Sequence, residues 1–347
     1  MKQQTKRWMP FVVLIALIFL IASPAQSAGD EFYQGKTVRF VVGFSPGGGF
    51  DTYTRMIARH FGKHVPGNPT TVVENKTGAG SLVAANYIYN QADPDGLTIG
   101  NWIGPLVLQQ VLGNKAAKLD GRKFGWLGVP TPDSGVCVLT QASGIKTVED
   151  WFASKRPIKI GGTAPGSTTD DVPKLVKVAL GLPIQMVEGY DGTSKIRLAA
   201  ESGEIDGGCW AWESIKPTWA KGIESGQARV VIQTMLQSHP ELKHVPLASK
   251  YAKTEEAREL LNVVNGPYGV LARPYSIAPG TPKERLAVLQ KAFMETLRDP
   301  ELLAEAEKAK LEIKPVDGPT VAKLMADLYT LKSATQEKLK EIVIPKK

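Results

Sequence analysis

Few of the side chains that build metal centres, cofactor sites or nucleic-acid surfaces occur in this sequence. It has four histidines among 347 residues, and His60 and His64 lie near an expected helix end before Pro66, where we expect them to be solvated. No Lys/Arg block interleaved with aromatic residues is present, which argues against a nucleic-acid partner. No nucleotide-binding glycine motif is complete and no carboxylate pair stands in an acid–base setting, so we expect neither a metal nor a cofactor.

Long apolar runs are confined to the N-terminus, where Phe11 to Ala22 follows three basic residues and precedes the small residues of 23–28. This order is typical of a signal peptide, and we predict one over residues 1–27, with cleavage after Ser27 or Ala28. The alternative is an uncleaved anchor, if Trp8 and Met9 extend the run to near spanning length. In either case the remaining chain acts outside the cytoplasm, and we expect it in the periplasm.

The expected mature chain is mildly basic and contains two cysteines. Removal of residues 1–27 leaves 39 basic and 34 acidic residues, and this net charge of +5 suits anionic solutes. Cys137 and Cys209 can form a disulfide in an oxidising compartment, or they can remain two buried thiols. A length of about 320 residues suggests two domains.

Short β-branched runs alternate with amphipathic helical stretches, which predicts an α/β fold with parallel sheets covered by helices. The first unit is a strand at 37–44 followed by a helix at 50–61, with Tyr53, Met56, Ile57 and Phe61 on one face. Further strands are predicted at 70–74, 97–101, 158–161 and 184–187, and further helices at 81–90, 170–180 and 194–202.

The last third of the chain is predicted to be extended over 263–271 and then to form three helices. Thr281-Pro282, Asp299-Pro300 and Asp317 to Thr320 each place a small polar residue and a proline where a helix should start. A change of domain is predicted near Pro130 to Pro132. Because no low-complexity linker is present, we expect extended crossings between the domains and a hinge.

The segment Gly43 to Gly47 formally matches the Gly-x-Ser-x-Gly nucleophile elbow of hydrolases. An elbow uses the backbone N–H of the residue after the serine to stabilise an oxyanion. Here that residue is Pro46, which has no N–H. We therefore expect no catalysis at Ser45 and no enzyme.

Two glycine loops follow successive predicted strands. Gly47, Gly48 and Gly49 precede a helix, so their N–H groups and the helix N-terminus can bind an anion. Gly78 and Gly80 follow the next strand, and ligands of open α/β sheets bind at such strand ends. The alternative is that these glycines only permit tight turns.

Motifs spread in order through nearly the whole mature chain resemble those of the tripartite tricarboxylate transporter receptors, also called Bug proteins. The motifs are Tyr33-x-x-Lys36-x-Val38-Arg39 leading into Pro46-Gly47-Gly48-Gly49-x-Asp51, Val73-Glu74-Asn75-Lys76-x-Gly78-Ala79-Gly80, Asp93-Pro94-Asp95-Gly96-x-Thr98, Gly166-Ser167, Tyr190-x-Gly192, Gly203-Glu204-Ile205-Asp206 and Ala278-Pro279-Gly280-Thr281-Pro282. The first two are the specific ones.

This resemblance implies a periplasmic binding protein fold of type II, with two doubly wound domains, a hinge and an interdomain cleft that closes on a carboxylate. We assign 28–130 with 264–347 to domain 1 and 131–263 to domain 2. The resemblance also implies that the ligand passes to a membrane complex of one large and one small integral subunit. We expect the receptor itself to be monomeric.

The resemblance places the ligand site on two walls of the cleft. One wall would hold Ser45, Gly47, Gly48, Gly49, Phe50, Thr52, Gly78, Ala79, Gly80 and Ser81, and the other Thr163, Gly166, Ser167, Thr168 and Thr169, with Tyr190, Asp191 and Gly192 close by. Neutral hydroxyls and N–H groups can hold a carboxylate, directly or through water, without a buried counter-charge. The alternative for Ser167 or Thr168 is helix capping, and we expect Asp51 to face its helix dipole rather than the ligand.

Two positions depart from the family pattern. Asp170 stands where relatives usually have His, and Trp210-Ala211 where they usually have Asp-Asn. Trp210 can face the cleft, or Trp210 and Trp212 can both belong to the core. If Trp210 faces the cleft, we predict a ligand with an aromatic or alkyl body and at least one carboxylate.

Three functions therefore compete for this chain. The favoured one is an extracytoplasmic receptor that delivers a small organic acid to a transporter. The others are a secreted sensor that signals to a membrane protein and a secreted hydrolase that uses Ser45. The sequence does not separate the receptor from the sensor.

Overall fold

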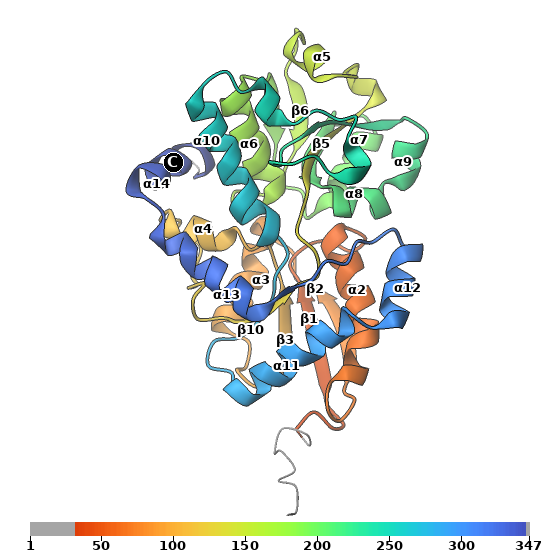
Figure 1. Cartoon of the computed structure of the whole chain (residues 1–347), viewed down its shortest axis with the longest axis vertical. Coiled ribbons are helices and arrows are strands. Elements are labelled where there is room, and N and C mark those ends of the chain that lie inside the picture. Colours follow the sequence, from red (N-terminus) through yellow and green to blue (C-terminus); the bar gives the residue numbers. More distant parts are fainter. Residues whose placement is uncertain (1–31, 345–347) are drawn as a thin grey trace, which may run out of the picture.

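The protein consists of two domains, each built around one mixed β-sheet, and these stand one above the other in Figure 1. The computed structural model describes residues 32–344, so the predicted signal peptide at 1–27 lies outside the described part. The two sheets with their helices confirm the α/β class predicted from the sequence. Within residues 32–344, no helix has both the length and the apolar character that crossing a membrane would need.

The first sheet has the strand order β11-β4-β10-β3-β1-β2. As predicted, β1 (Thr37–Val42), β2 (Thr70–Asn75) and β3 (Thr98–Asn101) are parallel. β10 (Tyr275–Ile277) runs antiparallel to both β3 and β4 (Gly125–Val129), and β11 (Val316–Asp317) runs antiparallel to β4. The C-terminal third of the chain therefore returns to this sheet and completes it.

The second sheet has the order β7-β6-β8-β5-β9. Here β6 (Ile158–Gly161), β7 (Ile184–Val187) and β8 (Gly207–Ala211) are parallel. β5 (Gly135–Thr140) is antiparallel to β8 and to β9 (Ala228–Gln233). The prediction of parallel sheets is therefore correct for the pairs among β1, β2 and β3 and among β6, β7 and β8. It is wrong for the pairs that contain β5, β10 or β11, because these three strands run in the opposite direction; β5 and β10 each follow a passage of the chain from one sheet to the other.

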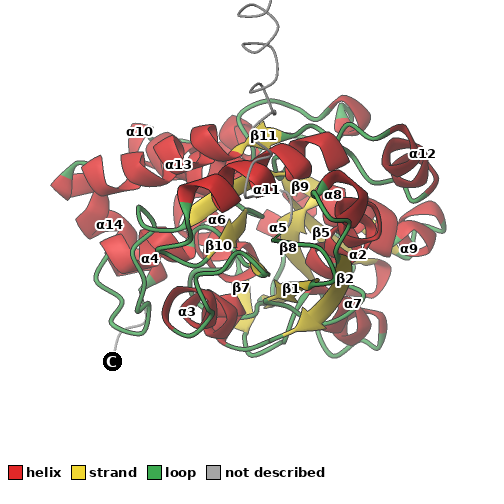
Figure 2. Cartoon of the chain, turned by 90° about the horizontal axis from the view of Figure 1, so that it is seen from below, coloured by secondary structure: helices red, strands yellow, loops and turns green. Residues whose placement is uncertain are grey.

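Helices cover both sheets, as Figure 2 shows. In the first domain these include α2 (Gly49–Phe61), α3 (Leu82–Asn90) and α4 (Leu106–Val111). The predicted apolar face of α2 is confirmed, because Tyr53, Met56, Ile57 and Phe61 are all buried. The second domain has α5 (Val148–Phe152), α6 (Thr168–Leu180), α7 (Thr193–Glu201), α8 (Trp212–Thr218), α9 (Ala220–Glu224) and α10 (Glu255–Asn265). Short 3₁₀ segments lie at Gly62–His64, Ala79–Ser81, Gln141–Ser143, Pro240–Leu242, Ala248–Tyr251 and Leu328–Thr330.

The C-terminal region differs from its prediction in two ways. The segment 263–271 is not extended: α10 runs to Asn265 and a π-helical turn, η6 (Gly266–Val270), follows it. Packing of α10 along α6 outweighs the weak helix propensity of the valines there. After α11 (Lys283–Thr296), α12 (Pro300–Lys308) and α13 (Gly318–Asp327), a fourth helix, α14 (Ser333–Val343), is present as well. The predicted caps Asp299 and Asp317 do accept from the first turns of α12 and α13.

The last helix bridges the two halves of the molecule. α14 packs against α6 of the second domain, and the Val343 carbonyl accepts a hydrogen bond from Gln109 of α4 at 3.4 Å. In Figure 1 the dark blue α14 lies at the waist of the molecule, beside α10 and α4. The residue ranges proposed for the two domains stay a prediction.

Cys137 and Cys209 form a disulfide inside the second domain. They face each other in the antiparallel register of β5 and β8, and both are fully buried. Of the two alternatives open in the sequence, the structure contains the pair. Since the crosslink joins residues 72 apart, it stabilises the fold by about 4 kcal/mol in a chain-entropy model.

Candidate functional site

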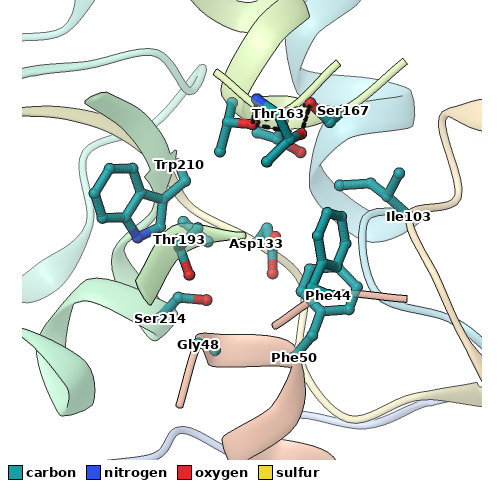
Figure 3. A pocket seen from close by; sticks show the side chains of 14 residues that line it. Phe44, Gly48, Phe50, Ile103, Asp133, Thr163, Ser167, Thr193, Trp210 and Ser214 are labelled. Atoms are coloured by element: carbon teal, nitrogen blue, oxygen red, sulfur yellow. Dashed lines mark hydrogen bonds between the residues drawn. The ribbon is translucent and has the colours of Figure 1, made fainter. Parts of the chain in front are cut away.

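A cavity lies between the two domains, with about 400 Å³ of empty space when the open solvent at its mouth is included. Loops after β1, β3, β6 and β8 bring side chains from both sheets to this place, as expected for strand-end sites. Its lining consists of Phe44, Gly48, Gly49, Phe50 and Ile103 on one side and Asp133, Thr163, Ser167, Thr168, Thr169, Thr193, Trp210, Ala211 and Ser214 on the other. Figure 3 shows these side chains around the open space.

Three helices begin at the cavity wall. Gly48 and Gly49 open α2, Thr168 and Thr169 open α6, and Thr193 opens α7. None of the three helices is capped by the side chain of its N-cap residue. A helix leaves its first N–H groups without intrahelical acceptors and has positive potential at this end. Three such ends, from both domains, make the cavity favourable for an anion.

The first glycine loop has this shape for two separate reasons. Gly47 adopts φ +75°, a left-handed conformation that favours glycine. Gly48 and Gly49 are needed because the second domain approaches them closely. A Cβ on Gly49 would lie 1.9 Å from Ser214 Oγ, and one on Gly48 would lie 2.9 Å from Thr193 Oγ1. The loop is therefore both a turn and a contact surface for the second domain.

Asp51 holds the glycine loop in place. Its carboxylate accepts hydrogen bonds from the Gly47 N–H at 2.9 Å, from Arg55 Nε and from Asn75 Nδ2. Burial raises the pKa of Asp51, but these donors together outweigh burial and lower it below its ordinary value. Asp51 is therefore an ionised anchor beneath the loop, and it does not line the cavity.

A cluster of hydroxyl groups forms the wall contributed by the second domain. Thr163, Ser167 and Thr169 are joined by hydroxyl contacts of 2.6 to 3.0 Å, and Ser167 also donates to the Ala164 carbonyl. The alternative that Ser167 caps α6 through its side chain is therefore not observed. Thr168 Oγ1 is buried and has no hydrogen-bond partner within residues 32–344. It is a free hydroxyl at the cavity.

A buried ion pair forms the floor of the cavity. Asp133 Oδ1 accepts from Arg273 Nε at 2.6 Å, and Arg273 Nη2 donates to Ser214 Oγ at 2.8 Å. Burial raises the pKa of Asp133, and the neighbouring Arg273 charge offsets part of this. Burial would lower the pKa of Arg273, but the Asp133 carboxylate raises it further above its ordinary value. We conclude that both groups are charged, because each is the other's counter-ion.

Aromatic rings form the remaining walls. Phe44 and Phe50 contact each other at 4.7 Å between ring centroids. Across the cavity, Trp210 stacks on Trp219 with ring centroids 5.9 Å apart, and Trp210 Nε1 is buried without a partner in the described residues. Trp212 does not line the cavity, and its Nε1 donates to Glu241 instead. Both alternatives for Trp210 thus hold in part: the indole is buried, and it lines the cavity.

Of the residues predicted for the site, the structure brings eight to the cavity wall. These are Gly48, Gly49, Phe50, Thr163, Ser167, Thr168, Thr169 and Trp210. The others, which do not line it, are Ser45, Gly47, Thr52, Gly78, Ala79, Gly80, Ser81, Gly166, Tyr190, Asp191 and Gly192. Whether each of them contacts a ligand stays a prediction.

Several of these other residues lie where the two domains meet. Ser45 Oγ is 2.8 Å from Ser194 Oγ, and the Ser45 N–H donates to the Asp191 carbonyl. A Cβ on Gly80 would lie 3.2 Å from the Ala164 carbonyl, so the second glycine loop contacts the loop after β6. Gly166 similarly has no room for a side chain, because Gln109 and Leu106 lie against it. The Tyr190 hydroxyl donates to Glu204 at 2.6 Å, within the second domain.

Sequence reasoning missed six lining residues: Phe44, Ile103, Asp133, Thr193, Ala211 and Ser214. It also missed Arg273, which holds Asp133 from behind. A signal for the ion pair exists in the sequence. Asp133 is the one charged residue between Lys123 and Lys146, and Arg273 is the one charged residue between Glu259 and Lys283. A single charge inside a long uncharged stretch is rarely buried without a partner.

Asp170, which departs from the family pattern, lies behind the cavity wall. It is fully buried and forms an ion pair with Lys174 at 2.6 Å. Burial raises the pKa of Asp170 to about 7, because Lys174 offsets burial only in part. Its neighbour Asp171 accepts from Tyr268, Gln109 and the Gly166 N–H. This pair of carboxylates supports the start of α6 from inside.

Two groups of side chains in the described residues have the composition of metal ligands. They are His60 with Asp299 and Glu301, and Glu213 with His239 and Glu312. Lys63 already pairs with Asp299 and Glu301, Lys314 pairs with Glu312, and the Ser134 N–H donates to Glu213. His60 and His64 are not simply solvated as predicted, because they bond to Glu305 and Asp299. These contacts explain both groups without a metal.

Comparisons with known proteins agree with the fold. Residues 54–340 match the family model described as tripartite tricarboxylate transporter family receptor. The chain is 26% identical to the UPF0065 protein in gbd 5'region of Cupriavidus necator, over 93% of both chains. The solved structure of the periplasmic binding protein BugD matches with a TM-score of 0.74 at 19% identity, covering 91% of this chain and all of BugD. The structure of MatC from Rhodopseudomonas palustris with bound malate matches with a TM-score of 0.71 at 19% identity, covering 88% of this chain and 99% of MatC.

Proposed function

The chain belongs to the tripartite tricarboxylate transporter receptor family, whose members are binding proteins rather than enzymes, and we propose that it closes on a small organic acid in the periplasm. The ligand would lie in the cavity between the two domains. One carboxylate of the ligand would accept hydrogen bonds from backbone N–H groups and hydroxyls of the wall. The closed receptor would then deliver this ligand to a membrane complex of one large and one small integral subunit.

The observation that carries this proposal is the convergence of three helix N-termini on one cavity. α2 comes from the first domain, whereas α6 and α7 come from the second. A carboxylate between them would interact with the positive ends of helices on both sides of the cleft. Because these ends separate when the domains separate, such a ligand would favour the closed arrangement. Malate, which is bound in the structure of the similar MatC, is a small organic acid.

The aromatic walls favour a ligand that carries an apolar group besides its carboxylate. Phe44, Phe50 and Trp210 line the cavity on opposite sides. Figure 3 shows Trp210 facing the two phenylalanine rings across the open space. Such walls favour an aromatic or alkyl body between them, as proposed from Trp210 in the sequence.

A thermal-shift screen tests the proposed function. The panel should contain aliphatic and aromatic mono-, di- and tricarboxylates, each beside its neutral amide and a cationic amine of the same body. We expect carboxylates alone to raise the melting temperature, by an amount that grows with ligand concentration as mass action requires. Stabilisation by the neutral or cationic members instead would contradict the proposal.

A further inference from the structure

One acceptor at the cavity has no donor. Asp133 uses Oδ1 to accept from Arg273, and within residues 32–344 no other hydrogen bond reaches its carboxylate. The side chain is 3% exposed, so bulk water does not solvate it freely. Figure 3 shows this carboxylate between Trp210 on one side and Phe44 on the other. Because Asp133 lines the cavity, a ligand can reach its second oxygen, and a group that donates a hydrogen bond to this charged acceptor would be strongly favoured.

The charges around this oxygen favour a donor over an acceptor. Arg273 is the counter-ion of Asp133, but Glu213, a second carboxylate, is buried close by. Arg273 Nη2 donates to Ser214, and Arg273 Nη1 is buried without a partner in residues 32–344, but Arg273 itself does not line the cavity. A ligand carboxylate placed beside Asp133 would therefore meet another acceptor rather than a donor, which disfavours it.

Asp133 and Thr168 also line a smaller cavity beside the main one. This second cavity of about 220 Å³ reaches Tyr268 and Gly269. Thr168 Oγ1 has no partner in the described residues, and neither has the indole N–H of Trp210. The cavity wall in the described residues thus offers a ligand the Asp133 acceptor and two free donors.

From this arrangement we infer that the ligand carries, besides its carboxylate, a hydroxyl or ammonium group that donates a hydrogen bond to Asp133. The receptor would therefore select hydroxy acids or amino acids with an apolar body over the unsubstituted acids. This inference rests on the proposed function, because it assumes that the carboxylate end lies at the three helix N-termini. In this arrangement one end of the cavity donates hydrogen bonds to the ligand carboxylate, and Asp133 accepts a hydrogen bond from the ligand.

Calorimetric titration of the unaltered protein tests this directly. The aromatic series consists of 3-phenylpropanoate as the parent, its 2-hydroxy, 2-amino and 2-oxo derivatives, and 3-(4-hydroxyphenyl)propanoate. The alkyl series consists of hexanoate as the parent, its 2-hydroxy, 2-amino and 2-oxo derivatives, and 6-hydroxyhexanoate. A charge-assisted hydrogen bond corresponds to at least about tenfold in affinity. We expect a hydroxy or amino member of a series to bind at least tenfold more tightly than its parent, and the 2-oxo member, which only accepts, to bind no better than the parent.

The variant Asp133→Asn reverses the sense of this contact. Its carbonyl oxygen can still accept from Arg273, whereas its amide now donates toward the cavity. We expect the variant to lose the preference for the donor-bearing acid and to bind the 2-oxo acid more tightly than the unaltered protein does. Asp327→Asn removes an exposed carboxylate from α13 and should leave all preferences unchanged. If Asp133→Asn does not fold, Asp133→Leu with Arg273→Met replaces the pair by apolar groups and should likewise abolish the preference.

The outcomes separate this inference from the proposed function. Equal binding of parent, hydroxy, amino and 2-oxo acids by the unaltered protein would overturn the inference and leave the proposed function intact. A preference for the hydroxy or the amino acid that survives in the folded Asp133 variants would also overturn it. Failure of every carboxylate to bind would overturn both. Within the supporting result, the hydroxy and amino arms show which donor the receptor takes.

Discussion

The hydroxyl oxygens of Ser45 and Ser194 lie 2.8 Å apart across the boundary between the two domains. Ser194 also donates to the Pro46 carbonyl at 3.0 Å, so the loop after β1 is joined to the start of α7. The serine that resembles a hydrolase nucleophile in the sequence therefore contacts another serine, and it acts in the contact between domains.

We expect Ser45→Ala to weaken ligand binding by up to about tenfold, since it removes one hydrogen bond worth about 1 kcal/mol from the closed arrangement. Ser194→Ala should weaken binding more, because it also removes the hydrogen bond to the Pro46 carbonyl. Calorimetry with the best carboxylate from the screen measures this. The double variant should lose little more than Ser194→Ala alone, because Ser194→Ala already removes the contact with Ser45. Ser225→Ala, a serine at the end of α9, serves as control. Complete loss of binding by a folded Ser45→Ala protein would contradict a role limited to domain contact.

Gly49→Ala should prevent closure without unfolding the protein. Its Cβ would meet Ser214 Oγ at 1.9 Å and the Ser214 Cα at 3.1 Å, and Ser214 belongs to the other domain. Opening the cleft relieves this clash, so we expect affinity to fall at least about 100-fold, as for a receptor whose closed state has become rare. Calorimetry and small-angle X-ray scattering with saturating ligand measure affinity and closure. Adding Ser214→Gly should restore part of the affinity, and full affinity in Gly49→Ala alone would show that the cleft does not close in this way.

Two substitutions of Trp210 distinguish the contribution of its ring to binding from that of its N–H group. Trp210→Ala removes the ring that faces Phe44 and Phe50, and we expect affinity for aromatic and alkyl acids to fall at least about tenfold. Trp210→Phe keeps a ring but removes the indole N–H, which has no partner in the described residues. Its affinity should therefore lie between that of the unaltered protein and that of Trp210→Ala. Affinities from calorimetry decide this. If Trp210→Ala keeps full affinity for the best ligand, Trp210 serves the core alone.

The stability of the protein should depend on the protonation of Asp171. Burial raises the pKa of this carboxyl group from an ordinary value of 3.8 to about 6, and hydrogen bonds from Tyr268, Gly166 and Gln109 offset this only in part. The folded protein therefore holds this proton more tightly than the unfolded chain does. Its stabilising contribution is complete below pH 3.8 and is lost as the pH rises through about 6.

An Asp171→Asn variant cannot titrate at this position. We expect its melting temperature, relative to that of the unaltered protein, to be higher at pH 7.5 than at pH 4. Asp170 and Lys174 lie at the same start of α6, and the Asp171 charge raises the pKa of Asp170, so the difference between the two proteins reports Asp171 together with its effect on Asp170. Asp327→Asn provides the control for a lost surface charge. A difference that does not change with pH would contradict the assignment of this proton to Asp171.

Much of the fold could be predicted from local sequence patterns. The strand at 158–161 and the apolar face of the helix after β1 depend on neighbouring residues, and both agree with the structure. The segment 263–271 could not be predicted in this way. Its glycine, proline and valines favour an extended chain, and only packing against α6, far away in the sequence, makes it helical.

In the candidate site too, residues set by local sequence could be predicted, whereas residues brought together by long-range packing could not. Gly48, Gly49 and the hydroxyls after β6 are visible as motifs, because a loop before a helix determines them locally. Asp133 and Arg273 are 140 residues apart, and the residues around each of them do not show which residue is its partner. The second glycine loop is a turn at a strand end, as the sequence predicts, and Gly80 lies against Ala164 of the second domain, so its contact with a ligand stays a prediction.

The most direct test of the central claim compares one carboxylate with its neutral twin. The best carboxylate from the screen and its primary amide have almost the same shape, but only the carboxylate has a charge for the N-termini of α2, α6 and α7 to stabilise. Calorimetric titration should show the amide binding at least about 100-fold more weakly, the loss expected for two charge-assisted hydrogen bonds. Equal affinity for the two compounds would contradict the account that this cavity is built to hold a carboxylate.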